Sequence, residues 1–66
     1  MEGGPRFIIF GDVIKGYWWR LRSAQGATIE SSGGRRHYHK SECEREVQSL
    51  KDERYPLAMV CDTTMG

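Results

Sequence analysis

The chain has 66 residues, of which 38% are hydrophobic and 29% are charged, and its formal net charge at pH 7 is +1. This length allows one domain with a small core, and the composition is typical of a folded chain rather than a disordered one. Wholly apolar runs such as Phe7 to Phe10 are far shorter than the roughly 20 residues of a membrane span.

Without a membrane span or an N-terminal signal segment, we expect a soluble protein of the cytoplasm. We expect a flexible N-terminus at 1–5, a single domain at 6–64 and a short C-terminal end at 65–66. The first 40 residues are mainly basic and the next 14 mainly acidic, which permits an anionic partner without requiring one.

The first predicted element is a strand in the segment RFIIFGD, residues 6–12. Its β-branched and aromatic residues favour a pleated surface. Since side chains alternate along a strand, Phe7 and Ile9 share one face, and Ile8 and Phe10 share the other.

The second predicted strand, GYWWRLRS, contains two adjacent tryptophans. Neighbouring side chains of a strand point to opposite faces, so the two indoles cannot share one core. Trp19 lies on the same face as Tyr17 and Leu21, which is apolar throughout, whereas Trp18 lies with two arginines. We therefore predict that Trp19 is buried and that Trp18 points outward.

A tight turn and a third strand follow. Gly26 supplies the positive φ that such a hairpin needs, and the segment ATIES after it alternates Ala27 and Ile29 with Thr28 and Glu30.

The periodicity then changes to that of a helix, from about His39 to Arg54. Cys43, Val47 and Leu50 form its apolar stripe, and either His39 or a Ser41–Glu44 capping box begins it. The apolar segment LAMVCD after the helix predicts a fourth strand.

These elements predict an α+β domain of order β-β-β-α-β. Strands joined by short turns are antiparallel, and one helix can cover one face of the sheet. We therefore expect an antiparallel β-sheet with one helix on one face and the opposite face open.

Four motifs together resemble the YegP-like family of small bacterial domains. They are F-x-I-F-x-D from Phe7, Y-x-W-R-L from Tyr17, G-x-x-I-x-x-S from Gly26 and K-x-x-C-x-x-x-V-x-S-L-K from Lys40. The resemblance implies the same β-β-β-α-β order and, for a single copy, a homodimer. It carries no catalytic residues.

The resemblance also implies that the motif positions are structural. The expected core positions are Tyr17, Trp19, Leu21, Ile29 and Val47. The chain departs from the family at Trp18 and Ile8, where polar residues are usual, and at Glu46, where glycine is favoured.

Residue types that can carry chemistry are present, but their arrangement does not favour catalysis. His37, His39, Cys43 and Cys61 lack the paired short spacings of a structural zinc site, so we predict no metal and no cofactor. Cys43 with His39 one helical turn earlier could form a nucleophile and base. However, Cys43 begins the apolar stripe, which favours a buried, inert thiol, and we predict that the protein is not an enzyme.

The acidic residues of the helix do not favour catalysis either. Glu42, Glu44 and Glu46 are predicted to form its solvated face, which leaves no pair of carboxylates for acid–base chemistry.

The outward sheet face is the best candidate for an interaction surface. The predicted interface residues on it are Ile8, Phe10, Trp18, Arg20 and Arg22. Exposed apolar patches usually mark interaction surfaces, and Trp and Arg are enriched at interface hot spots. We therefore expect a self-associating, homodimeric module.

Two alternatives stay open for this face. Aromatic and basic side chains on an open sheet can bind single-stranded nucleic acid or another anion, with help from a basic loop formed by Arg35, Arg36, His37 and Lys40. Alternatively, the arginine stems simply cover the apolar side chains, and the face is solvated.

Overall fold

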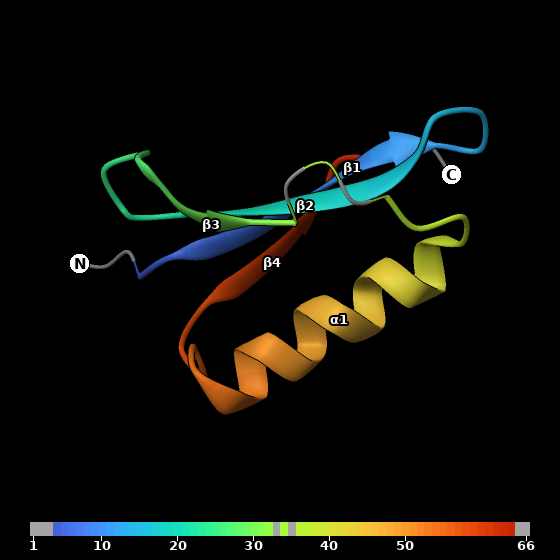
Figure 1. Cartoon of the computed structure of the whole chain (residues 1–66). Helices are drawn as coiled ribbons and strands as arrows, with labels where there is room; N and C mark the ends of the chain where they lie inside the picture. The colour runs from blue at the N-terminus through green and yellow to red at the C-terminus, as the bar shows by residue number, and fades with distance from the viewer. Residues whose placement is uncertain (1–3, 33, 35, 65–66) are drawn as a thin grey trace.

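The structure is a computed structural model that describes residues 4–32, 34 and 36–64 (Figure 1). Most of the ends expected to be flexible, at 1–3 and 65–66, lie outside the described residues, and so does Arg35. The elements in chain order are β1 (Arg6–Asp12), β2 (Gly16–Arg22), β3 (Thr28–Ser31), α1 (Lys40–Glu53) and β4 (Met59–Asp62). The predicted α+β class and β-β-β-α-β order are confirmed.

The sheet has the spatial order β3-β2-β1-β4. β1 pairs antiparallel with β2, and β2 pairs antiparallel with β3, as predicted. β4 pairs parallel with β1, so the sheet is mixed rather than antiparallel throughout. The reason is the helical crossover, which returns the chain to the end of the sheet where β3 began. β4 therefore runs in the direction of β3, which is also that of β1.

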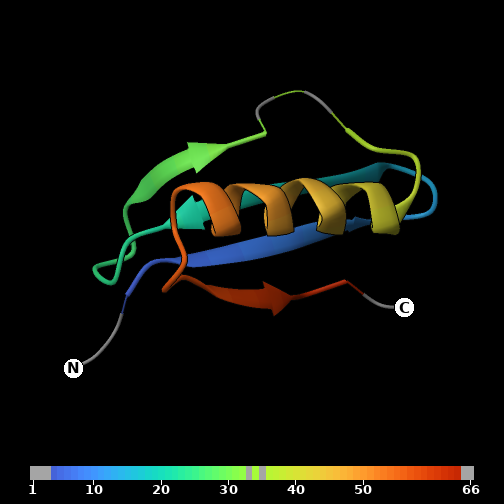
Figure 2. The same ribbon diagram turned by 90° about the horizontal axis from the view of Figure 1, so that it is seen from below.

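The helix covers one face of the sheet, above its two central strands. Figure 2 shows α1 in front of β1 and β2, with β3 and β4 to either side of it. No helix among the described residues is long and apolar enough to span a membrane.

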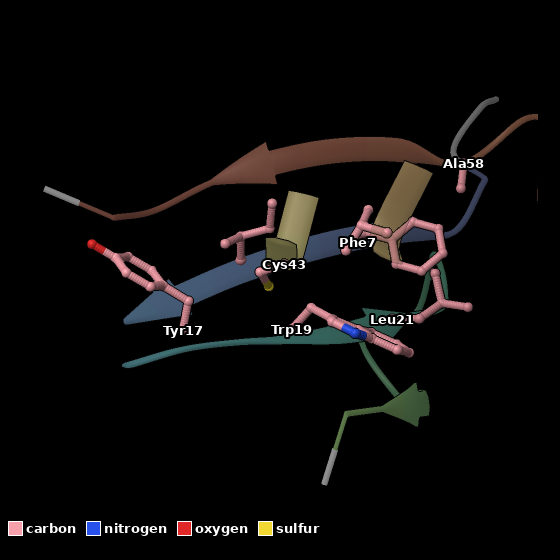
Figure 3. Packing of buried hydrophobic residues seen from close by; sticks show 8 residues of the cluster. Phe7, Tyr17, Trp19, Leu21, Cys43 and Ala58 are labelled. Atoms are coloured by element: carbon pink, nitrogen blue, oxygen red, sulfur yellow. The ribbon is translucent and has the colours of Figure 1, made fainter. Parts of the chain in front are cut away.

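The core lies between α1 and this face of the sheet (Figure 3). Its buried members are Phe7, Ile9, Tyr17, Trp19, Leu21, Cys43, Val47 and Ala58. The Phe7 ring and the Trp19 indole pack edge to face, with ring centroids 5.6 Å apart and planes at 68°, a favoured geometry for aromatic pairs. The predicted alternation in the first two strands is thus confirmed, with Trp19 inside and Trp18 outside.

Ile29 does not join this core, contrary to the expectation from the family motif. A register shift between Leu21 and Arg22 places Glu30, rather than Ile29, opposite the buried Leu21. Ile29 is consequently 46% exposed. The irregularity is a β-bulge, which adds one residue to a strand and changes which side chains face the core.

The β1–β2 hairpin depends on two glycines. Both have positive φ, 129° at Gly11 and 88° at Gly16. A Cβ atom at Gly11 would lie 2.1 Å from the carbonyl oxygen of Gly16, so no larger residue fits there. In the turn, the Asp12 carboxylate accepts hydrogen bonds from the backbone N–H groups of Ile14 and Lys15. The turn glycine predicted at Gly26 also has positive φ, 92°.

The helix begins and ends close to the predicted residues. His39 is its N-cap but makes no side-chain capping hydrogen bond, and Ser41 lies inside the helix, so no Ser41–Glu44 capping box starts it. At the other end, the Arg54 N–H donates to the carbonyls of Leu50 and Lys51. The stripe is confirmed by the burial of Cys43 and Val47.

Candidate functional site

The face of the sheet opposite α1 contains all five residues predicted as an interface. In the β1–β2 register, Phe10 lies opposite Trp18, Ile8 opposite Arg20, and Arg6 opposite Arg22. Ile8, Phe10 and Trp18 are each half-buried, whereas Arg20 is exposed. We call this surface the open face.

The aromatic side chains of the open face are stacked between guanidinium groups. The Phe10 and Trp18 rings are 5.9 Å apart and nearly parallel, at 17°. The Arg36 guanidinium lies 4.3 Å from the Trp18 ring, and that of Arg20 lies 5.7 Å from the Phe10 ring. Cation–π contacts of this kind stabilise the arrangement.

The Trp18 indole therefore contacts both Phe10 and Arg36. Phe10 approaches from β1, while Arg36 approaches from the other side of β2, where His37 forms a backbone bridge with Tyr17. This explains why Trp18 is only partly exposed although no helix lies over it. A nucleobase that stacked on this indole would compete with Arg36 for the ring.

The charge of the open face is mainly positive. Its described residues include four arginines, namely Arg6, Arg20, Arg22 and Arg36. The Nε of Arg22 is buried and has no hydrogen-bond partner among the described residues. By contrast, Glu30 and Asp62 pair in register with Leu21 and Ile9, which places both acids on the helix side. The positive charge of the open face therefore lies on the opposite side of the sheet from these two acids.

The predicted basic loop does not form one cluster. Arg36 joins the open face, whereas His37 turns towards the helix and lies 3.0 Å from the Glu46 carboxylate. Lys40 forms an ion pair with Asp62 of β4. This contact is the main cause of the lowered pKa of Asp62, about 2.

Glu46 has a role that the sequence analysis missed. The buried Trp19 donates its indole N–H to Glu46 Oε1 at 2.7 Å, and His37 Nε2 lies near the same oxygen. The expectation that Glu46 is a simple solvated side chain is therefore wrong. The pattern that could have indicated this is its position beside Val47 and three residues after Cys43, together with a buried indole that needs an acceptor.

A second surface, also missed, follows the edge strand β4. Leu57 is 86% exposed, Met59 66% and Val60 43%. Three large apolar side chains are thus accessible within four residues. The unbroken apolar segment LAMVC could have indicated this, because a strand covered on only one face normally alternates with polar residues.

Scans of protein-family models, curated proteins and solved structures gave no match to this chain. The likeness to the YegP-like family accordingly rests on the sequence motifs, and the roles of the residues rest on their contacts.

The two cysteines occupy different environments. Cys43 is fully buried, and Figure 3 shows its side chain between the helix and the sheet. Burial raises the pKa of its thiol to about 11, so the reactive thiolate is scarce at neutral pH. Cys61, on β4, is only half-buried. Among the described residues, no group of three or more His, Cys, Asp or Glu side chains could hold a metal ion.

This difference predicts unequal thiol reactivity. In the folded protein at pH 8, we expect a chromogenic disulfide reagent to modify Cys61 quickly and Cys43 at least about a hundredfold more slowly, because a pKa near 11 leaves little thiolate. The Cys61→Ser variant should show only the slow phase. In urea, both thiols of the wild-type protein should react rapidly. Rapid native labelling of the Cys61→Ser variant would contradict the burial of Cys43.

Proposed function

We propose that this chain is a non-enzymatic interaction module that self-associates into a homodimer. The observation that carries the proposal is the exposed apolar segment at β4, comprising Leu57, Met59 and Val60. Transfer of one such side chain out of water contributes about 1.5–3 kcal/mol. A domain of this size has only a small core, so a partner that covers these residues would add substantially to its stability.

Two features support a non-enzymatic role, and a third supports the proposed location. The Cys43 thiol is buried, and its pKa is raised. The His37 and Glu46 side chains, a potential acid–base pair, are engaged with each other and with the Trp19 indole. Both cysteines are free, which suits the reducing cytoplasm that we propose as the location.

The open face is the second candidate surface, and its charge favours a different partner. Four arginines on one face attract phosphate or carboxylate groups. We propose an anionic ligand, with single-stranded RNA as the probe, as the second function of the chain. Two copies joined through their open faces would bring these arginines together, which makes the predicted interface of Ile8, Phe10, Trp18, Arg20 and Arg22 less favourable for a homodimer.

Sedimentation equilibrium over a range of protein and salt concentrations tests these alternatives. We expect a dimer whose dissociation constant changes little with salt, because β4 carries no arginine. A dimer formed through the open faces would instead become tighter as salt screens the arginines, and Trp18→Glu would dissociate it with helix content retained. A monomer at all concentrations would contradict self-association.

RNA binding should respond to salt in the opposite way to a dimer formed through the open faces. Its affinity should fall steeply with added salt because phosphate contacts release counterions. Arg20→Ala combined with Arg22→Ala should weaken it, whereas Arg45→Ala, on the exposed side of the helix, should not. Binding that is insensitive to both changes would contradict an anion site on the open face.

A further inference from the structure

One end of the open face holds two arginines directly opposite each other. Arg6 of β1 and Arg22 of β2 are register partners. Both lie on the face away from α1, since their neighbours Phe7 and Leu21 are buried on the helix side. Like charges in directly opposed positions of a strand pair are destabilising. An anion bound between the two guanidinium groups would replace this repulsion with attraction.

Neither arginine is paired with an acid in the described part of the chain. Their side chains form no hydrogen bond or ion pair with another described residue, and the buried Nε of Arg22 is an unsatisfied donor. Buried donors are nearly always satisfied, and an exception calls for a partner such as a water or an ion. Asp12, the acid of β1, lies at the opposite end of the strand, where its carboxylate accepts hydrogen bonds from backbone N–H groups of the turn. The arginine pair is therefore free to bind a ligand.

A hollow of about 260 Å³ lies beside this pair, lined by Arg6, Ile8 and Arg22 together with residues 23–26 of the β2–β3 turn. Figure 1 shows this turn rising from the sheet on the side away from α1. The turn thus closes one end of the open face. The hollow is smaller than the roughly 300–1,000 Å³ of sites that enclose a drug-sized ligand, so it suits one ionic group of a larger ligand.

We propose that Arg6 and Arg22 bind the terminal phosphate of a single-stranded RNA that lies along the open face. This proposal rests on the anion binding proposed for that face and names the part of the ligand that is recognised. A phosphate monoester carries a charge of about −1.5 to −2 at pH 7, which two guanidinium groups match. A phosphodiester within the chain carries a single negative charge. Arginine can also bind phosphate through two parallel N–H donors.

The rest of the open face supplies the other contacts that an RNA strand needs. The next register pair on the same face, Ile8 with Arg20, provides another cation. The pair after it, Phe10 with Trp18, lies about 13 Å along the strands from the arginine pair. A base could stack there in competition with Arg36. Because the β2–β3 turn rises at the other end, a bound strand stops at the arginine pair, and its phosphate there is a terminal one.

The affinity gained from a terminal phosphate tests this site. A short oligouridine with a 5′-phosphate, one with a 3′-phosphate and the unphosphorylated form would each be titrated into the full chain by calorimetry. We expect one phosphorylated form to bind about tenfold more tightly than the unphosphorylated form, since charge-assisted hydrogen bonds are the stronger class. Arg6→Gln combined with Arg22→Gln should abolish this gain.

Two single variants control for charge and for folding. Arg20→Gln removes a positive charge from the same face, so it should weaken all three oligonucleotides by a similar factor and preserve the gain. Arg6→Gln alone changes an exposed residue and should remove most of the gain. This single variant keeps the test decisive if circular dichroism shows that loss of the half-buried Arg22 impairs folding.

The outcomes distinguish this proposal from anion binding by the open face in general. Equal affinity for the phosphorylated and unphosphorylated forms would overturn the terminal-phosphate site and leave RNA binding intact. The same holds for a gain that Arg6→Gln does not reduce, or that Arg20→Gln reduces as much. If none of the three oligonucleotides bound, both proposals would be overturned.

Discussion

Phe7→Ala is expected to unfold most of the protein at 25 °C. Phe7 is fully buried, and its ring meets both Trp19 and Tyr55, whose ring centroids lie 5.6 Å and 6.0 Å away. Truncation of a buried Phe to Ala costs about 3–5 kcal/mol, because transfer energy is lost and a cavity remains. The total stability of a domain this small is rarely more than about 3–5 kcal/mol. Far-ultraviolet circular dichroism and urea titration would measure the loss.

Phe10→Ala is the matched control for this prediction. It makes the same change in the same strand, but on the open face, where Phe10 is half-buried and stacked on Trp18. We expect a loss of about 1–2 kcal/mol, because part of the ring is already in contact with water. Equal destabilisation by the two substitutions would contradict the assignment of the core to the helix side of the sheet.

Glu46→Ala is expected to lower the free energy of unfolding by about 1–3 kcal/mol, the cost of leaving a buried donor unsatisfied. The donor is the indole N–H of Trp19, a residue that is only 4% exposed. Urea titration followed by tryptophan emission would measure the change, and a local change in emission at zero urea should accompany it.

Two further substitutions, one at a nearby position and one at the same position, control for the loss of a carboxylate from the helix. Glu44→Ala, at an exposed position one residue before Arg45, should change stability by less than about 0.5 kcal/mol. Glu46→Gln keeps an oxygen that can accept from the Trp19 indole and should lose much less than Glu46→Ala. If Glu44→Ala and Glu46→Ala were equally destabilising, the Trp19 hydrogen bond would not be the cause.

The order of elements and most of the core follow from local periodicity. Alternation in β1 and β2 separates Trp19 from Trp18 correctly, and the i, i+4 spacing of Cys43 and Val47 identifies the buried side of α1. These features are predictable because each depends on residues that are close in the chain and face one common core.

The errors concern relations between distant segments. A bulge in β3 places Glu30, rather than Ile29, opposite the buried Leu21. The alternation of that segment alone does not indicate the bulge. The bond from Trp19 to Glu46 joins residues 27 positions apart, and the Arg36 contact with Trp18 depends on where the loop after β3 meets β2. Such contacts depend on tertiary packing, and the periodicity of a single sequence does not indicate which distant residues will meet.

The parallel pairing of β1 with β4 also affects the order in which the chain can fold during synthesis. β1 is made first yet occupies the interior of the sheet, and one of its two neighbours, β4, is made last. While the ribosome is still adding β4, the hairpin of β1 and β2 presents an unpaired interior edge. Because this final pairing is the most non-local one in the sheet, closing it should be slow relative to the hairpins, and the nascent chain is most open to pairing with the wrong strand until then.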